Sequence, residues 1–157
     1  MKKVAYLSKV RIERQQGPDR LAYLPAEKEP VRFGVHGAVA EHYGLTGEKL
    51  PEPHATTLDY VVAAAGGGLT GTFGGALEAR QIDASGGRLT AEVEGEIETE
   101  NKVLIIRRIR VVYHLKASEA DREMVERVYQ IHHQHCPVYM SLHKAIEIRT
   151  ELRMEGE

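Results

Sequence analysis

The strongest constraint on the fold lies between residues 89 and 116, where apolar and charged residues alternate along two segments. The first segment sets Leu89, Ala91, Val93, Gly95 and Ile97 against Thr and Glu, and the second sets Ile, Val, Tyr and Leu against Arg, His and Lys. A period of two is that of a strand with one buried and one wet face. We therefore predict an antiparallel hairpin that turns at residues 99–101, with an acidic row facing a basic row.

Arg107 interrupts this alternation, because Arg108 follows it directly and both cannot take the wet face of a regular strand. An arginine at such a position must lie at an edge, find a partner, or follow a β-bulge. The sequence leaves these three outcomes open.

A second constraint is the helical pattern of residues 57–80, in which apolar residues recur at steps of three and four. Thr56 or Thr57 can serve as the N-cap, with Asp59 in the first turn. Six glycines interrupt its middle: Gly66, Gly67, Gly68, Gly71, Gly74 and Gly75. Relative to alanine they would cost on the order of 5 kcal/mol. We expect such a helix to be central and buried, with another backbone close against it.

The rest of the chain supplies shorter elements. Residues 3–35 are expected to be extended segments, and residues 36–55 a long loop with at most one helical turn. Ser118-Glu119-Ala120-Asp121 resembles a shortened capping box that opens a helix. Pro137 favours the start of a short helix over residues 137–144, and residues 146–152 alternate as a last strand. The order predicts an α+β protein of antiparallel sheets with two main helices, in one domain over residues 1–157.

Composition excludes several classes of function. The 157 residues carry a formal net charge of −2 with interspersed signs, so we expect no nucleic-acid or anionic-membrane partner. No stretch approaches eighteen apolar residues, and the N-terminus lacks the apolar core of a signal peptide. The single cysteine, Cys136, rules out an internal disulfide. These features predict a cytoplasmic protein.

Two candidate ligand motifs are weak. Gly66-x-Gly68-x-x-Gly71 matches the dinucleotide-binding fingerprint, but the strands that follow alternate with polar residues instead of reading as buried parallel strands. We therefore assign these glycines to close helix packing and predict no cofactor. His132 and Cys136 would share a helix face and could bind zinc, but no other ligands have recognisable spacing, so we predict no metal site.

Cys136 leaves two interpretations open. A lone cysteine is usually a small buried hydrophobic residue. If Pro137 begins a helix, however, the thiol lies at its N-terminus beside His133 and His135, and both features favour the thiolate.

The motifs at residues 57–72 and 136–142 together resemble the OsmC/Ohr family of peroxide reductases. Cys136-Pro137-Val138-Tyr139-x-x-Leu142 is similar to the family's second-cysteine motif, and the segment from Thr57 to Thr72 to its first helix. The resemblance covers nearly the whole chain, from Arg32 to Leu152. It implies an OsmC-like fold of two intertwined subunits, hence a homodimer, with paired central helices between sheets.

The resemblance also implies thiol-dependent reduction of organic hydroperoxides. In the family a first-helix cysteine attacks the peroxide, helped by an arginine and a glutamate, and a second cysteine resolves the sulfenic acid. Here Gly68 occupies the attacking position and Cys136 the resolving one. The glutamate's place falls at Leu58 or Asp59, so Asp59 is a weak candidate, and the arginine is unassigned among Arg11, Arg14, Arg20 and Arg32. Glycine has no nucleophile, and without a second thiol no intramolecular disulfide forms.

Two hypotheses follow. In the first, the protein has lost two-cysteine peroxidase activity but keeps the dimer and an apolar interfacial pocket that binds a small hydrophobic ligand. In the second, it reduces hydroperoxides with Cys136 alone, and an outside thiol recycles it. The absence of a cysteine at position 68 favours the first hypothesis, and the retained Cys136 with its nearby histidines favours the second. A third possibility, a purely structural or partner-binding dimer, has no distinguishing sequence feature. A closed, dry contact between Gly68 and Cys136 would favour a scaffold, and an open pocket would favour ligand binding.

Overall fold

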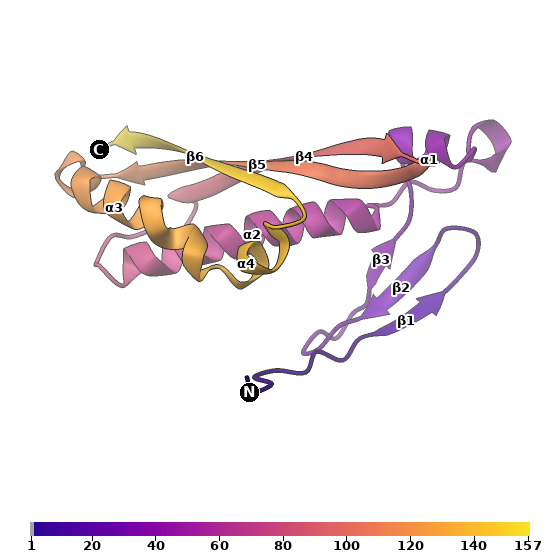
Figure 1. Cartoon of the computed structure of the whole chain (residues 1–157), viewed down its shortest axis with the longest axis horizontal. Coiled ribbons are helices and arrows are strands. Elements are labelled where there is room, and N and C mark those ends of the chain that lie inside the picture. Colours follow the sequence, from indigo (N-terminus) through magenta and orange to yellow (C-terminus); the bar gives the residue numbers. More distant parts are fainter. Residues whose placement is uncertain (1) are drawn as a thin grey trace. The chain divides into compact units, whose positions relative to one another are not determined.

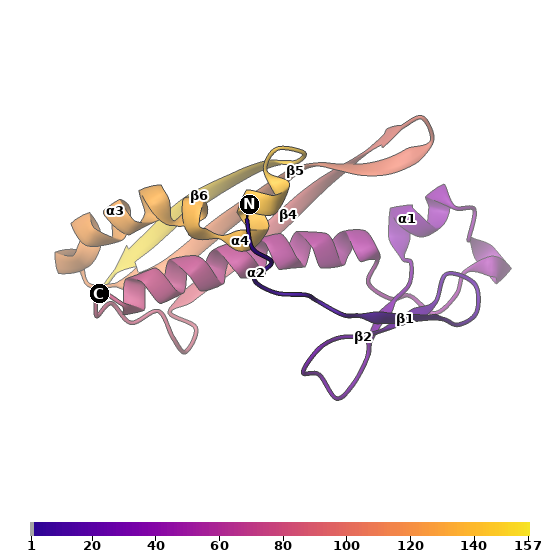
Figure 2. The same cartoon turned by 60° about the horizontal axis from the view of Figure 1, so that its bottom comes forward.

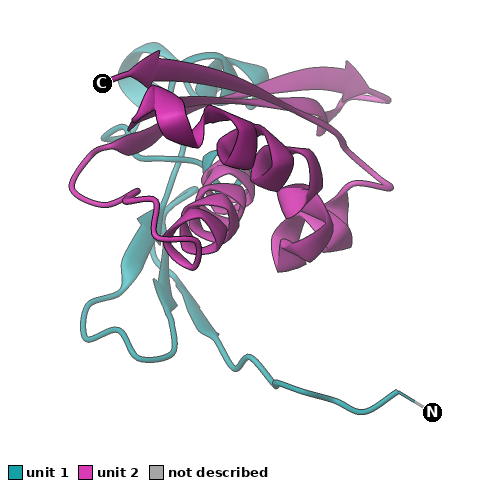
Figure 3. Cartoon of the chain, turned by 90° about the vertical axis from the view of Figure 1, so that its left-hand side faces the viewer, with its two compact units in different colours: residues 1–60 teal, residues 61–157 magenta. Residues whose placement is uncertain are grey.

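The computed structural model describes residues 2–157, and the chain divides into two compact units, residues 1–60 and residues 61–157 (Figure 3). The α+β class predicted from the sequence is confirmed. The prediction of one domain over residues 1–157 stays a prediction.

The first unit contains a small antiparallel sheet in the order β1-β2-β3, formed by Arg11–Arg14, Arg20–Tyr23 and Val31–Phe33. The apolar residues that precede and begin β1 are exposed: Val4, Tyr6, Leu7, Val10 and Ile12. The extended segment predicted from residue 3 therefore becomes a paired strand only at Arg11.

The segment predicted as a long loop contains helix α1, Gly37–His42, and a 3-10 turn, η1, Gly47–Lys49. Two backbone hydrogen bonds close its base, from the Gly34 N–H to the Ala55 carbonyl at 2.9 Å and from the His54 N–H to the Val35 carbonyl at 3.1 Å. A Cβ on Gly34 would lie 2.8 Å from His54 Cβ, so this close approach requires glycine.

Helix α2, Thr57–Glu78, begins in the first unit and runs through the second. The second unit adds strands β4, Leu89–Glu100, β5, Val103–Ala117, and β6, Glu147–Gly156, in the order β4-β5-β6. Between β5 and β6 lie η2, Glu119–Asp121, α3, Arg122–His132, η3, His133–His135, and α4, Pro137–Leu142. Figures 1 and 2 show α2, α3 and α4 on one face of this sheet.

The predicted hairpin is formed by β4 and β5, and its turn is at Asn101 and Lys102, both with positive φ. Arg107 is the extra residue of a β-bulge, because Glu96 is opposite Arg108 while the next residue, Ile97, is opposite Ile106. The extra arginine also finds partners, in Glu98 at 3.6 Å and in Glu100.

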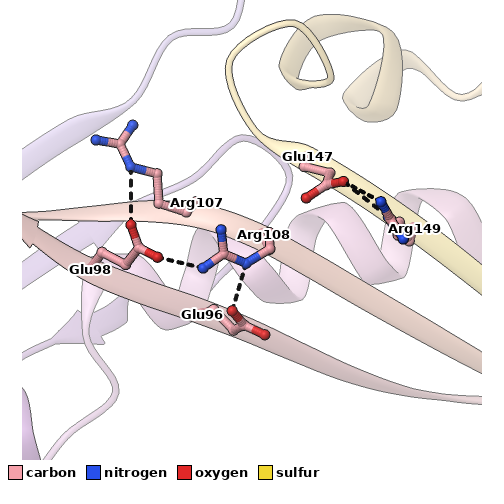
Figure 4. A network of polar contacts seen from close by, with 6 residues as sticks. All are labelled: Glu96, Glu98, Arg107, Arg108, Glu147 and Arg149. Atoms are coloured by element: carbon pink, nitrogen blue, oxygen red, sulfur yellow. Dashed lines mark hydrogen bonds and ion pairs between the residues drawn. The ribbon is translucent and has the colours of Figure 1, made fainter.

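Ion pairs run across the outer face of the sheet at this bulge. Figure 4 shows Arg108 between Glu96 at 2.6 Å and Glu98 at 2.5 Å, with Arg149 paired to Glu147 on β6 at 2.7 Å. The acidic row facing a basic row is thus confirmed for β4 and β5.

Two details differ from the prediction. Strand β6 runs parallel to β5, so the second sheet is mixed rather than antiparallel, because α3 and α4 form a crossover that returns the chain to the same end. The box at Ser118 caps a 3-10 turn, accepting from the Ala120 N–H at 3.2 Å, and α3 itself begins only at Arg122.

The core of the second unit lies between β5 and the helices. Its buried side chains include Leu69, Phe73, Leu77, Ile109, Val111, Tyr113, Leu115, Val125 and Val128. Two glycines of α2 allow β4 to pack closely against the helix. A Cβ on Gly66 would clash with the Val93 side chain, and a Cβ on Gly74 would lie 3.3 Å from Leu89. Gly67, Gly71 and Gly75 face open space in the single chain, so the predicted burial of α2 holds for one face only.

Within residues 2–157, the helices all fall short of the length and apolarity needed to cross a membrane.

Candidate functional site

Cys136 is the N-cap of α4, as the sequence predicts from Pro137, which occupies the first turn of that helix. The Cys136 backbone is extended, and its Sγ accepts a hydrogen bond from the Tyr139 N–H at 3.4 Å. The residue is 0% exposed in the single chain. The thiol therefore acts as a capping group inside the second unit.

Gly68 lies directly against this thiol. A Cβ built on Gly68 would be 3.3 Å from Cys136 Sγ and 3.3 Å from both Cβ and Cγ2 of Val138. The structure thus brings together the two positions that the sequence pairs as attacking and resolving sites. The space between them is filled by the sulfur and by Val138, so the contact is closed.

A buried polar pair lies in the same core. The Tyr113 hydroxyl is 2.8 Å from His132 Nε2, and His132 Nδ1 is 2.6 Å from the Tyr129 carbonyl oxygen. Since a carbonyl oxygen only accepts, Nδ1 carries the proton and Nε2 accepts from the tyrosine. The ring of Phe73 lies 4.9 Å from each of the Tyr113 and His132 rings.

Burial shifts the titration of both groups toward their neutral forms. It raises the pKa of Tyr113 and lowers the pKa of His132 below its ordinary value of 6.5. Both ring nitrogens of neutral His132 already have hydrogen-bond partners in the core, so neither is free to bind a metal ion. Among residues 2–157, no three His, Cys, Asp or Glu side chains converge closely enough to hold a metal ion.

Asp59 caps α2 in the first unit. Its Oδ2 accepts from the Thr56 N–H at 2.8 Å, and its own N–H donates to Thr56 Oγ1 at 3.0 Å, which completes a capping box. His36 Nε2 is 2.8 Å from the same oxygen. Burial alone would raise the pKa of Asp59, but these hydrogen bonds outweigh it and leave the pKa lowered. One oxygen of the carboxylate, Oδ2, thereby holds the helix start and His36 together.

The four arginines considered from the sequence all lie in the first unit, and three have printed contacts there. Arg11 pairs with Glu13 at 2.9 Å, Arg32 pairs with Asp19 at 2.5 Å, and Arg20 donates to the Pro18 carbonyl. These local pairs do not single out one arginine as a site residue.

Sequence reasoning missed Tyr113 and the structural role of His132. The sequence pattern indicates His132 only as a possible zinc ligand beside Cys136. A histidine four residues before a buried cysteine, together with a tyrosine on the apolar face of the neighbouring strand, was the available signal.

Comparison with known sequences decides the family. The sequence profile of OsmC-like proteins matches residues 49–151 of this chain. The chain belongs to the OsmC-like protein family. The matched segment includes both Gly68 and Cys136, as well as the hairpin between them. A search of curated proteins finds no significant match.

Solved structures of the same fold support this membership. An OsmC-like protein from Mycoplasma pneumoniae is 10% identical, covers 96% of this chain and 99% of its own, and has a TM-score of 0.72. An OsmC-like protein of unknown function from Vibrio cholerae is 9% identical, with 94% and 99% coverage and a TM-score of 0.74. The organic hydroperoxide resistance protein OhrB of Bacillus subtilis is 15% identical, with 96% and 100% coverage and a TM-score of 0.62. At these identities the likeness shows the OsmC fold alone.

Proposed function

We propose that this OsmC-family chain has lost two-cysteine hydroperoxide reduction and works as a homodimer that binds a small hydrophobic ligand. Family membership is consistent with a role related to peroxide resistance, and one structural neighbour is itself named for organic hydroperoxide resistance. The observation that carries the loss of activity is the contact between Gly68 and the enclosed Cys136 sulfur.

The two-cysteine reaction needs a thiolate at position 68. That thiolate would attack the peroxide, release an alcohol and become a sulfenic acid, which the second thiol would convert to a disulfide with loss of water. Gly68 offers no sulfur for the first step, and the chain has one cysteine in all. The missing group is the nucleophile itself, so the reaction is removed rather than slowed.

Burial also weighs against a one-cysteine enzyme. A peroxide oxygen must touch Cys136 Sγ to be reduced, but the residue is fully buried and its sulfur caps α4. The closed contact between Gly68 and Cys136 favours a purely structural role for the thiol. A ligand would therefore bind elsewhere.

The groove between α2 and β4 is the place we assign to the ligand. It has a volume of about 500 Å³ and is lined mainly by the small and apolar residues Gly67, Gly71, Gly75, Ala91 and Val93. The three glycines have nothing within 4 Å of their Cβ positions in the single chain. A second subunit beside α2 would turn this open groove into an enclosed apolar pocket, which is the usual character of a small-molecule site.

Peroxide consumption tests the loss of activity. Wild type, Cys136→Ser and Gly68→Cys would be assayed side by side with cumene hydroperoxide and a dithiol reductant. We expect wild type and Cys136→Ser to be equal to the free-thiol background. Saturable turnover by wild type that disappears in Cys136→Ser would contradict the proposal and establish the one-cysteine enzyme.

Binding of the fluorescent probe N-phenyl-1-naphthylamine tests the groove. Gly71→Leu should abolish saturable binding by filling the groove, whereas Ala79→Leu, at an exposed position after the end of α2, should not. Sedimentation of both variants shows whether the dimer persists. Equal binding by wild type and both variants, with the dimer intact, would refute this location.

A further inference from the structure

We propose that His132 and Tyr113 form a proton-operated latch, which keeps the segment around the single thiol closed at neutral pH and lets it open in acid. This thiol segment, residues 133–143, follows His132 directly and contains η3, Cys136 and α4. His132 is 1% exposed, and Tyr113 and Cys136 are 0% exposed. The latch lies in the core of the second unit, so the inference does not depend on the ligand groove of the proposed function.

The latch joins the end of α3 to β5. The Tyr113 hydroxyl donates to His132 Nε2 at 2.8 Å, and His132 Nδ1 donates to the Tyr129 carbonyl oxygen at 2.6 Å. His132 is the last residue of α3, so its bond to Tyr113 holds the chain to the sheet at the point where the thiol segment begins. Release of this bond frees the thiol segment at its start.

A second hydrogen bond keeps α3 itself in place on the sheet. The Tyr129 hydroxyl and Thr150 Oγ1 are 2.9 Å apart, and neither group gains a proton in mild acid. This bond ties α3 to β6, three residues before His132. Loss of the His132 bond therefore loosens the thiol segment without releasing the helix that precedes it.

Protonation of His132 removes the acceptor on which the latch depends. An imidazolium has two N–H donors and no acceptor, so Nε2 can no longer receive the tyrosine proton. If the Tyr113 hydroxyl turned to accept from Nε2, its own proton would be unpaired, since His132 is its one hydrogen-bond partner among residues 2–157. A buried unpaired donor and a buried charge are both unfavourable, so the protonated core favours opening.

Among residues 2–157, the side chains that face the His132 ring offer it no negative charge. They are Phe73 of α2, Tyr113 of β5, Tyr129 of α3 and His133 of η3. Burial lowers the pKa of His132, the hydrogen bond to the Tyr129 carbonyl partly offsets this, and a charged His133 lowers the pKa further. Cys136 is the next titratable group, and it adds to the effect of burial in raising the pKa of Tyr113. The closed state therefore excludes the proton that the open state accepts.

The open population should increase only on the acid side. Above pH 6.5, the ordinary pKa of histidine, His132 is neutral in both states and the latch holds fully. As the pH falls below 6.5, the open state takes up a proton that the closed state does not. Because opening takes up at most one proton, the open population should rise by up to about tenfold between pH 7.5 and pH 5.5.

Hydrogen exchange measured by NMR tests the latch on two amides of the thiol segment. The Tyr139 N–H donates to Cys136 Sγ at 3.4 Å, and the Met140 N–H donates to the Cys136 carbonyl at 2.9 Å. Their protection factors, in which the pH dependence of free amides cancels, should decrease by up to about tenfold between pH 7.5 and pH 5.5 in wild type. At both pH values they should be lower than those of Val111 and Val112 in the centre of β5, which we expect to exchange only through global unfolding.

Substitutions at two neighbouring histidines assign the pH dependence. His132→Gln keeps an acceptor oxygen for the Tyr113 hydroxyl but does not titrate, so its protection factors should agree within about twofold at the two pH values. The matched control is His133→Gln, which removes the adjacent histidine but leaves the latch hydrogen bond in place, and it should keep the acid response of wild type. His132→Phe is a second variant that does not titrate, and melting curves show which variants are folded.

Equal protection of the Tyr139 and Met140 amides at pH 7.5 and pH 5.5 in wild type would overturn the latch. Protection as high as that of Val111 and Val112 would also overturn it, because the thiol segment would then open only when the whole chain unfolds. An acid response that persists in folded His132→Gln or His132→Phe but disappears in His133→Gln would place the proton on His133 and overturn the inference as well.

Discussion

A disulfide should form between positions 68 and 136 when Gly68 is replaced by cysteine. The Cβ of residue 68 would lie 3.3 Å from Cys136 Sγ. Within a disulfide, bond geometry places a Cβ about 3 Å from the far sulfur, so the required movement is a few tenths of an ångström. The same Cβ would press on Val138 at 3.3 Å, so the reduced variant should be less stable than wild type by about 1–3 kcal/mol.

Oxidation should reverse that loss. The bond would close a loop of about 69 residues, for which the chain-entropy estimate is roughly 4 kcal/mol of stabilisation. The oxidised variant should therefore be more stable than its reduced form by up to this amount, and at least as stable as wild type. Urea unfolding with and without reductant measures the difference, while thiol titration and mass spectrometry count the free sulfurs.

Gly71→Cys is the matched control, because nothing lies within 4 Å of the Cβ position of Gly71. It should keep both thiols free of an intramolecular bond under the same mild oxidation. Persistence of two titratable thiols in oxidised Gly68→Cys would refute the close approach of the two positions.

Three further predictions concern folding and assembly. Val111→Asp should prevent folding, because it buries an unpaired charge at a 0% exposed position, whereas charge reversal at the exposed neighbour Arg110 should change the free energy of unfolding by less than about 1 kcal/mol. Circular dichroism and urea titration distinguish the two, and a folded Val111→Asp would contradict the assigned inner face. Since the folded state lowers the pKa of His132, its contribution to stability should be complete above pH 6.5 and decrease as the pH falls below that value. Urea unfolding at pH 7.5 and 5.5 should show this loss in wild type but less of it in His132→Phe, and identical pH dependence would contradict the assignment. The protein should sediment as a homodimer at micromolar concentration, and a stable folded monomer would exclude that assembly.

Patterns with a strong period predicted the second unit well. The alternation of residues 89–116 predicted the inner and outer faces of β4 and β5. Arg107 indicated an irregularity, for which a bulge was one of three open outcomes. The parallel direction of β6 could not be predicted from its own alternation, because a period of two is the same in both directions. The direction of β6 depends on whether α3 and α4 carry the chain back along the sheet before β6 begins. The period of the strand contains no information about this path.

The candidate site was predicted in part. Pro137 correctly placed Cys136 at a helix start, and the family resemblance paired it with Gly68, which lies against it. The closed character of the contact was not predictable, because it depends on Val138 and on the depth of packing. Asp59 caps a helix together with Thr56. Its position in the first turn is compatible with capping and with catalysis, so the sequence alone could not distinguish the two roles.

The capping role of the Cys136 sulfur makes this thiol an intrinsic kinetic probe of local opening. A thiol reagent can modify it only when α4 separates from the core, so the labelling rate would report the free energy of that opening. Once modified, the sulfur would carry a bulky group where the Tyr139 N–H and Gly68 now meet it, and the opened state would be trapped. The time course of labelling under native conditions would therefore record how often this corner of the protein unfolds, without any engineered reporter.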